Sequence, residues 1–132
     1  MLEHLAIIES RVTRMIAAAA ETADTLGDAA QERPSIDMER LLDRSRPVAG
    51  PESIQPREGL DSVAAWQRLQ ETRAELRHVI EAASGRDLSG TVRTHPILGD
   101  MHMYQWIAVI GGHEARHALQ IREVGVLLTA TR

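Results

Sequence analysis

The 132-residue sequence contains no cysteine, no phenylalanine and no lysine. Without cysteine the chain has no disulfide framework, no thiolate nucleophile and no cysteine-ligated metal site, so any metal must be held by nitrogen or oxygen atoms. Aromatic residues are limited to Tyr104, Trp66 and Trp106. Leu, Ile, Val, Ala and Met supply nearly all of the apolar content, which suits packed helices better than a β-sandwich. The composition therefore predicts an all-α fold.

The charged residues show no concentration of one sign. All 15 basic residues are arginines, the formal net charge is -4, and no long acidic or basic run occurs. Such a distribution gives no electrostatic footprint for nucleic acid or for an anionic membrane. No stretch of about 18 apolar residues and no signal-peptide pattern is present. We therefore expect a cytoplasmic protein without a nucleic-acid or membrane partner, folded as a single domain over residues 1–132.

Apolar residues at three- and four-residue spacing predict three long helices and a short one. The long helices are expected from Leu2 to about Leu26, from a cap at Asp61 or Ser62 to about Ala83, and from about Met101 to Leu128. Gly27 and Gly85 are expected to end the first two. A short helix is expected over Ile36 to Asp43, with Ser35 as its N-cap.

Two segments between these helices are rich in helix breakers. Arg46 to Leu60 and Arg86 to Asp100 contain most of the prolines and several glycines, and both are predicted to be loops. The second of the long helices is expected to bury one face, formed by Val63, Trp66, Leu69, Arg73, Leu76, Val79 and Ile80.

The third long helix carries His113 and His117, four residues apart. Residues at this spacing lie on one helical face with Cβ atoms about 5–6 Å apart, so two imidazoles can converge on one ion. Neutral imidazole suits Zn, Ni, Fe or Cu, and Gln120 is placed one turn further on to orient His117. The pair lies in a strongly apolar helix, where an unsatisfied polar group costs about 1–3 kcal/mol. A divalent metal site is therefore predicted.

The segment His113-Glu114-Ala115-Arg116-His117 also matches the H-E-x-x-H pattern of zinc proteases, in which the glutamate is a general base. Such proteases need a further ligand on a following segment, and none of the 15 residues after His117 is a histidine. The protease interpretation is therefore disfavoured. A third ligand must come from elsewhere, and His4 on the apolar side of the first helix is the best placed.

The other histidines receive different interpretations. His78 is expected to be solvated, and His95 in the loop before Pro96 is expected either to cap that loop or to line a pocket. His102 lies about 16 Å along the helix axis from His113 and cannot share its metal.

Three segments together resemble the DinB-like superfamily of four-helix-bundle metalloproteins. They are Leu2 to Glu9, His95-Pro96-Ile97-Leu98-Gly99, and Trp106 through Ile121. The resemblance implies a DinB-like helical bundle in which His4, His113 and His117 form the metal triad and His95 lies beside the pocket. Members of the family include thiol S-transferases and a mycothiol-dependent maleylpyruvate isomerase, in which the metal is implied to activate the thiolate of a low-molecular-weight thiol. Family chains usually have a full helix before the segment that matches Leu2 to Glu9, so the chain is expected to lack the family's first helix.

Three functions remain open. The first is a metal-dependent transferase that acts on a small-molecule substrate with a low-molecular-weight thiol as cosubstrate. It would use Zn or Ni, with His95 or Glu114 as catalytic proton carriers and Arg116 as an anion contact. For Glu114 and Arg116 a structural ion pair is the stronger interpretation. The second is a metal-dependent hydrolase, and the third is a metal-binding module without turnover. Because three long helices leave an apolar face that a fourth would cover, we expect a homodimer.

Overall fold

The computed structural model describes residues 1–27, 36–45, 50–56 and 59–130. Its four helices are α1 (Leu2–Thr22), α2 (Met38–Leu42), α3 (Ser62–Ala82) and α4 (Met103–Ala130). Two short 3₁₀ helices, η1 (Glu52–Ile54) and η2 (Leu88–Gly90), and two short strands, β1 (Val92–His95) and β2 (Gly99–His102), complete the described elements. The prediction of an all-α bundle with three long helices and a short one is confirmed.

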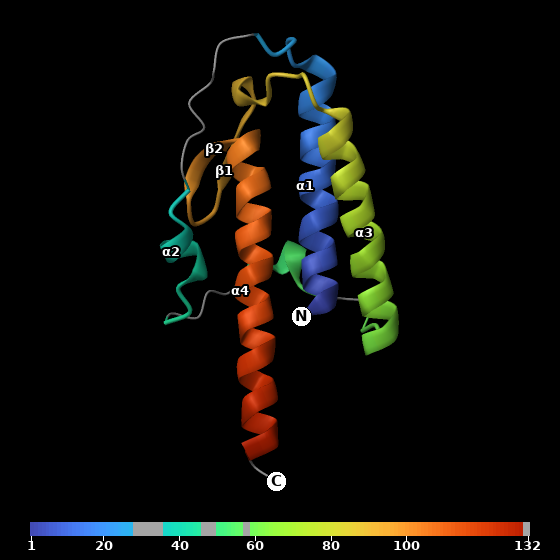
Figure 1. The fold of residues 1–132 in the computed structure, drawn as a ribbon, viewed down its shortest axis with the longest axis vertical. Coiled ribbons are helices and arrows are strands. Elements are labelled where there is room, and N and C mark those ends of the chain that lie inside the picture. The colour runs from blue at the N-terminus through green and yellow to red at the C-terminus, as the bar shows by residue number, and fades with distance from the viewer. Residues whose placement is uncertain (28–35, 46–49, 57–58, 131–132) are drawn as a thin grey trace.

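The three long helices lie side by side (Figure 1). α1 and α3 run in the same direction and α4 runs opposite to both, while α2 and the β1–β2 hairpin flank α4 on the side away from α3. α1 packs closely along α3 and also meets α4. This arrangement brings the start of α1 beside the middle of α4.

The apolar spacing of α1 explains its packing. Leu5, Val12 and Ile16 lie on one face and are buried. The helix ends at Thr22 rather than near the predicted Leu26, because the next residues are extended and pair with the segment after α3. Leu26 N donates to the carbonyl of Gly85 at 2.7 Å, and Asp87 N donates to the carbonyl of Asp24 at 2.8 Å.

The ends of α3 follow the sequence signals. The Asp61 carboxylate accepts from Val63 N and Ala64 N, each at 2.9 Å, and so satisfies two free amide groups of the first turn. After α3, Gly85 adopts φ +83, a left-handed conformation that favours glycine. The predicted cap and the predicted stop are both confirmed.

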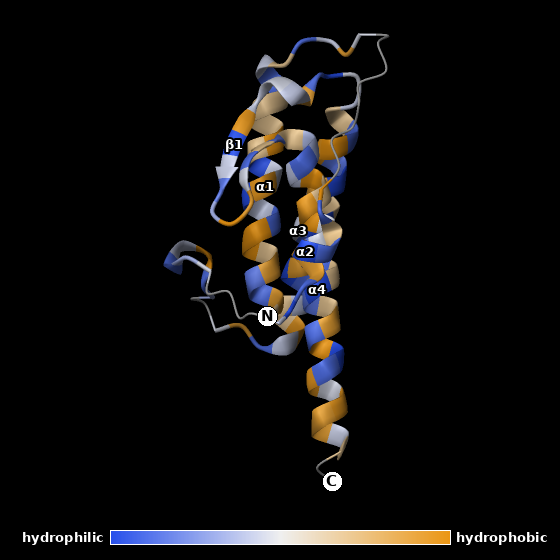
Figure 2. Cartoon of the chain, turned by 90° about the vertical axis from the view of Figure 1, so that its left-hand side faces the viewer, coloured by the Kyte–Doolittle hydropathy of each residue, from blue (hydrophilic) through white to orange (hydrophobic). Residues whose placement is uncertain are grey.

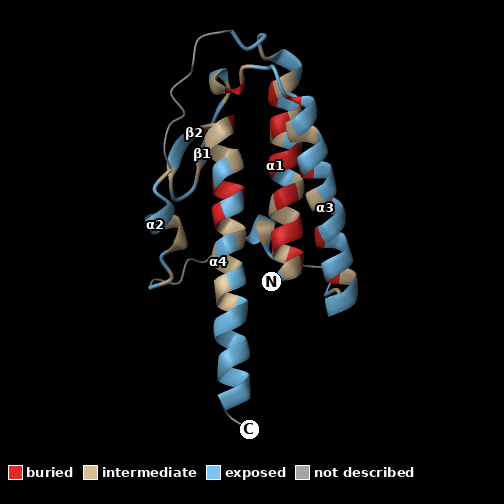
Figure 3. Ribbon diagram, in the orientation of Figure 1, coloured by how far each residue is buried: buried red, intermediate tan, exposed pale blue. Residues whose placement is uncertain are grey.

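The main apolar core lies where α1 ends and α4 begins (Figure 3). Ile16 and Met103 are 0 % exposed at its centre. The core also includes Val12, Ala19, Leu76, Ala83, Leu88 and Ile110. A smaller cluster of Leu5, Ala6 and Leu69 lies nearer the start of α1.

The segment predicted as a loop from Arg86 to Asp100 contains the antiparallel hairpin of β1 and β2. Its register pairs Val92 with His102 and His95 with Gly99. Gly99 has φ +79 and follows a three-residue connection, an arrangement typical of hairpins with a left-handed residue at the turn. The prediction of a loop over this range was therefore wrong.

α2 is shorter than predicted and begins later. The Asp37 side chain accepts from Arg40 N at 3.0 Å and caps it. The predicted cap, Ser35, lies outside the described residues, as does part of the predicted Arg46 to Leu60 connection. The described part of that connection contains η1, which contacts α1.

Part of the predicted buried face of α3 is exposed. Val63 is 75 % exposed and Trp66 is 52 % exposed, whereas Leu69 and Leu76 of the same expected face are buried against α1. The reason is geometric. Val63 and Trp66 lie on the flank of α3 that also carries the half-buried Arg73, beside the face that Leu69 and Leu76 bury against α1.

The last ten residues of α4 are also exposed, from Ile121 to Ala130. This end of the helix projects beyond α1 and α3 (Figure 1) and remains rich in apolar residues (Figure 2). Within the described residues, no helix is both long and apolar enough to cross a membrane.

Candidate metal centre

Three histidines from two helices meet at one point of the bundle. His4 lies in the first turn of α1, and His113 and His117 lie on consecutive turns of α4. One nitrogen of each ring lies within 4.8 Å of the others. The rings of His4 and His113 have centroids 5.3 Å apart, as do those of His4 and His117. The structure thus brings together the three residues that the sequence proposed as ligands.

A hydrogen bond orients His4. Its Nδ1 lies 2.9 Å from the carbonyl oxygen of Ile54 in η1. A carbonyl can only accept, so Nδ1 carries the proton and Nε2 keeps a free electron pair. A backbone carbonyl in this position is a common partner of metal-binding histidines, because it fixes both the tautomer and the ring orientation.

The α4 pair faces the same point. Nε2 of His117 lies 3.2 Å from Nε2 of His113. Burial lowers the pKa of His113 to about 4, helped by the nearby His117 and His4. Burial also lowers the pKa of His117, with His4 contributing. Both imidazoles are therefore neutral near pH 7, the state in which the ring nitrogen can bind a metal.

The second ring nitrogen of His117, Nδ1, is also buried. It has no hydrogen-bond partner among the described residues, and the same is true of Oε1 of Gln120, which is buried as well. These two atoms come from neighbouring turns of α4, and the side chain of Gln120 is close enough to His117 to oppose the lowering of its pKa. A hydrogen bond between the two side chains would give His117 the same outer support that Ile54 gives His4.

The donor set fits a divalent transition metal. Ring nitrogens bound to one zinc ion lie about 2.0–2.1 Å from it, which places two of them roughly 3.4 Å apart at a tetrahedral angle. The 3.2 Å separation of the two Nε2 atoms agrees with this value. Three neutral imidazoles suit Zn or Ni better than Mg or Ca, which prefer oxygen ligands. The three histidines could therefore bind a metal ion.

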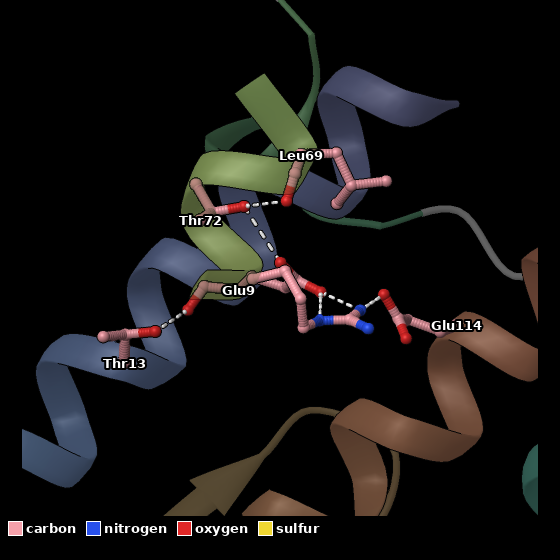
Figure 4. Close-up of polar contacts among 6 residues, drawn as sticks. Glu9, Thr13, Leu69, Thr72 and Glu114 are labelled. Atoms are coloured by element: carbon pink, nitrogen blue, oxygen red, sulfur yellow. Dashed lines mark hydrogen bonds and ion pairs between the residues drawn. The ribbon is translucent and has the colours of Figure 1, made fainter. Parts of the chain in front are cut away.

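A buried ionic network lies beside the triad and links all three long helices (Figure 4). Glu9 of α1 is 1 % exposed, and its carboxylate accepts from Thr72 Oγ1 at 2.9 Å and from Arg73 Nε at 2.9 Å. The Arg73 guanidinium also pairs with Glu114 of α4. Arg73 thereby joins α3 to the turn of α4 that carries His113.

The other charged residue of the H-E-x-x-H segment is also occupied. Arg116 donates to the carbonyl of Leu41 at 3.3 Å and to the carbonyl of Asp43, at the end of α2. α2 approaches α4 closely at Gly112, where an added Cβ would lie 2.2 Å from Cδ2 of Leu41. Glu114 thus makes the kind of ion pair that the sequence favoured for it, whereas Arg116 donates to backbone carbonyls in place of the expected ion pair.

His95 lies at the end of β1 and caps the hairpin turn. Its Nδ1 accepts from Ile97 N at 3.1 Å and from Leu98 N at 3.2 Å, so the neutral ring carries its proton on Nε2. Its centroid lies 5.2 Å from that of Trp106 in α4. Burial lowers the pKa of His95, and His95 in turn contributes to the lowered pKa of His113. His95 therefore lies on the triad side of the hairpin.

The remaining histidines lie away from the triad. His78 is exposed on α3, as expected. His102 precedes α4 and forms a reciprocal cap with Gln105. His102 N donates to Gln105 Oε1 at 3.1 Å, and Gln105 N donates to His102 Nδ1 at 3.3 Å.

Two residues at the site were missed in the sequence. Glu9 and Ile54 both support the triad region, the first through Arg73 and the second through His4. Glu9 carried a signal, since it lies four residues after Leu5 and three before Val12 and so interrupts the buried face of α1 with a charge. Ile54 carried none, because it acts through its backbone carbonyl.

Comparison with known proteins agrees with this geometry. The sequence profile of the DinB superfamily matches residues 1–121. The chain belongs to the DinB superfamily. The matched region of this DinB protein includes all three histidines of the triad and ends where α4 begins to project. The chain is also 27 % identical over 125 residues to the uncharacterized protein YuaE of Bacillus subtilis (strain 168), an alignment that covers 94 % of this chain and 74 % of YuaE. No solved structure matches the chain.

Proposed function

We propose that this DinB protein is a Zn- or Ni-dependent transferase that uses a low-molecular-weight thiol to act on a small-molecule substrate. The observation that carries the proposal is the convergence of His4, His113 and His117, whose ring nitrogens lie within 4.8 Å of one another. Three ligands leave at least one position open in a four-coordinate ion, as in catalytic zinc sites. An open coordination position distinguishes a catalytic metal site from a structural site, in which protein ligands fill every position.

A metal ion held by this triad would lower the pKa of a bound thiol and so supply a thiolate near neutral pH. The chain's own residues prepare the site for that chemistry. The low pKa values of His113 and His117 keep both rings neutral and ready to bind. The carbonyl of Ile54 directs Nε2 of His4 toward the pair. The Glu9–Arg73–Glu114 network fixes α1, α3 and α4 relative to one another beside these ligands.

His95 is the better supported of the two proposed proton carriers. Burial lowers its pKa and keeps the ring neutral near pH 7. To carry a proton, the ring would accept it at Nδ1 in place of the amides of Ile97 and Leu98 and return it from the imidazolium. Glu114 is paired with Arg73, and a carboxylate held ionised by a guanidinium is a poor proton donor. In this proposal Glu114 anchors the α4 turn instead.

A metal-binding module without turnover is the second candidate. A cleft of about 400 Å³ with polar lining lies on the outward face of α1, where Ser10, Arg11 and Arg68 line it. This cleft is not lined by any member of the triad. It would therefore not present a substrate to the metal, and the polar neighbours Glu114 and Arg116 are already engaged.

The proposal includes a cytoplasmic homodimer. Exposed apolar residues on α3 and α4 support association of two chains, because a bundle of three long helices leaves such residues uncovered.

Cobalt substitution tests the use of a thiol. We expect protein loaded with Co²⁺ to develop a sulfur-to-cobalt charge-transfer band when a low-molecular-weight thiol is added, and no such band with the S-methylated form of the same molecule. The thiol, but not its S-methyl derivative, should also raise the melting temperature of the zinc-loaded protein, because a ligand of the native state stabilises it. If no small thiol changes the cobalt spectrum, the transferase proposal is contradicted and the module is supported.

A further inference from the structure

The projecting end of α4 is apolar on several sides, and on another side its Glu123 pairs with Arg44. Its five large apolar residues are between 46 % and 67 % exposed. They are Ile121, Val124, Val126, Leu127 and Leu128. A helix that is apolar around most of its circumference is normally buried. The match to the DinB superfamily ends at residue 121, so nearly all of this end, residues 121–130, lies beyond the matched region.

One stripe of this end continues the inward face of α4. Ile121, Val124 and Leu128 follow His117 at intervals of four, seven and eleven residues, which places them on the same side of the helix. Above them this side faces α1 and carries the triad. Below the start of α1, no helix or strand of the described residues covers this side, as the projecting end shows in Figure 1.

An uncovered apolar patch on α3 lies at the same level. Arg73 of α3 pairs with Glu114 of α4, and the two helices run in opposite directions. Seven residues before Arg73 lies Trp66, and seven residues after Glu114 lies Ile121, each on the same face as the paired residue. Trp66 and Val63, exposed by 52 % and 75 %, therefore lie at the same level along the bundle as the base of the projecting end.

The exposed area on the proposed contact approaches what a stable dimer needs. Ile121, Val124 and Leu128, with Val63 and Trp66, expose on the order of 600 Å², against about 800 Å² that each partner buries in an interface of standard size. The projecting end and the lower part of α3 also have similar lengths. Along the helix axis, the residues from Ile121 to Ala130 extend about 15 Å, and the residues from Val63 to Arg73 extend about the same distance.

We propose that the occupant of this surface is a second copy of the chain, with the two projecting ends packed antiparallel. Each end then covers the other along the stripe of Ile121, Val124 and Leu128 and reaches the Val63–Trp66 patch of the other copy. One chain supplies both the projecting helix and the patch, so a two-fold axis satisfies both surfaces at once and closes the assembly. This surface is the contact of the homodimer in the proposed function, on which it rests.

Light scattering after size exclusion at micromolar concentration tests this surface. The unaltered protein should be a dimer, and Val124→Glu should make it a monomer with unchanged helical content. Thr129→Glu is the matched control, since it adds the same charge on another side of the same helix, and it should remain a dimer. A monomeric unaltered protein, an assembly larger than a dimer, or a Val124→Glu protein that remains a dimer would overturn the proposal.

Crosslinking provides a second test that does not depend on a destabilising charge. Because the chain has no cysteine, Trp66→Cys and Leu128→Cys each introduce a single thiol. A short bismaleimide should join the two variant chains when they are mixed, well beyond the amount seen with Trp66→Cys alone. No product in the mixture would overturn the pairing. Metal content measured on the same samples should remain unchanged in all variants, which separates a failure of this surface from a failure of the metal site.

Discussion

The two ends of the bundle are stabilised in different ways. Where α1 ends and α4 begins, the helices meet through apolar side chains around Ile16 and Met103, both 0 % exposed. Where α1 begins, the same helices meet through Glu9, Arg73 and Glu114 and through three histidines. The comparison shows that one end is held mainly by apolar burial, together with the backbone pairing that ends α1. The other end holds polar groups that are retained only because each is paired, or because a ligand would pair it.

The largest expected effect comes from the apolar end. Ile16→Ala removes a fully buried side chain and should lower the free energy of unfolding by about 3 kcal/mol, while Ile16→Val should lower it by about 1 kcal/mol. Urea denaturation of the metal-free protein measures both. Metal stoichiometry at the opposite end should not change in the folded variants. A loss of metal from folded Ile16→Val would show that the two ends are not independent.

The next effect concerns the buried ionic network. Arg73→Met leaves the Glu9 carboxylate buried with only the Thr72 hydroxyl as partner, and we expect a loss of about 2 kcal/mol because an unpaired buried charge is costly. Adding Glu9→Gln to Arg73→Met removes the charge and should recover at least half of that loss. Denaturant titrations of the two variants provide the measurement. Equal stabilities would contradict the role of Arg73 as the partner that compensates the buried Glu9 carboxylate.

Acid should destabilise the end of the bundle that holds the three histidines. The pKa of His113 is lowered from 6.5 to about 4 in the folded protein, so between these pH values the unfolded chain binds a proton that the folded chain does not. The free energy of unfolding of the metal-free protein should therefore fall as pH drops from about 6.5 to about 4, by on the order of 2 kcal/mol from this residue. Urea titrations at both pH values should show a smaller fall in His113→Ala and an unchanged fall in His78→Ala. An identical fall in all three proteins would contradict this assignment.

The smallest expected change in stability comes from two neighbouring glycines of α4. At Gly111 an added Cβ meets no atom within 4 Å, whereas at Gly112 it would clash with Leu41 of α2. Alanine favours a helix over glycine by about 1 kcal/mol, so Gly111→Ala should stabilise the protein, and Gly112→Ala should give less than half of that gain. Thermal denaturation of the two variants tests this difference. Equal gains would show that α2 does not pack against Gly112 in solution.

The helices were predictable from the sequence because their signals are local. The three- and four-residue spacing of Leu5, Val12 and Ile16 and the cap at Asp61 depend only on neighbouring residues. The end of α1 was not predictable, because it is fixed by backbone pairing with the segment after α3. The hairpin was missed because its strands are short and mostly exposed, and its one clear signal was the three-residue turn before Gly99.

The site was predictable to a different degree. His113 and His117 share a helix, so their spacing alone placed them on one face, and the family resemblance added His4. The network of Glu9, Arg73 and Glu114 joins three helices, and no local pattern pairs residues 64 and 41 positions apart. Val63 and Trp66 were wrongly expected in the core because periodicity identifies an apolar face without showing whether a neighbour covers it.

Elemental analysis of the purified protein tests directly whether the three histidines bind a metal ion. We expect about one divalent transition-metal ion per chain. The metal should be lost in His113→Ala and in His117→Ala, strongly reduced in His4→Ala, and retained in His78→Ala. All four variants should keep their helical content. Unchanged metal content in both His113→Ala and His117→Ala would contradict the metal centre on which the proposed function depends.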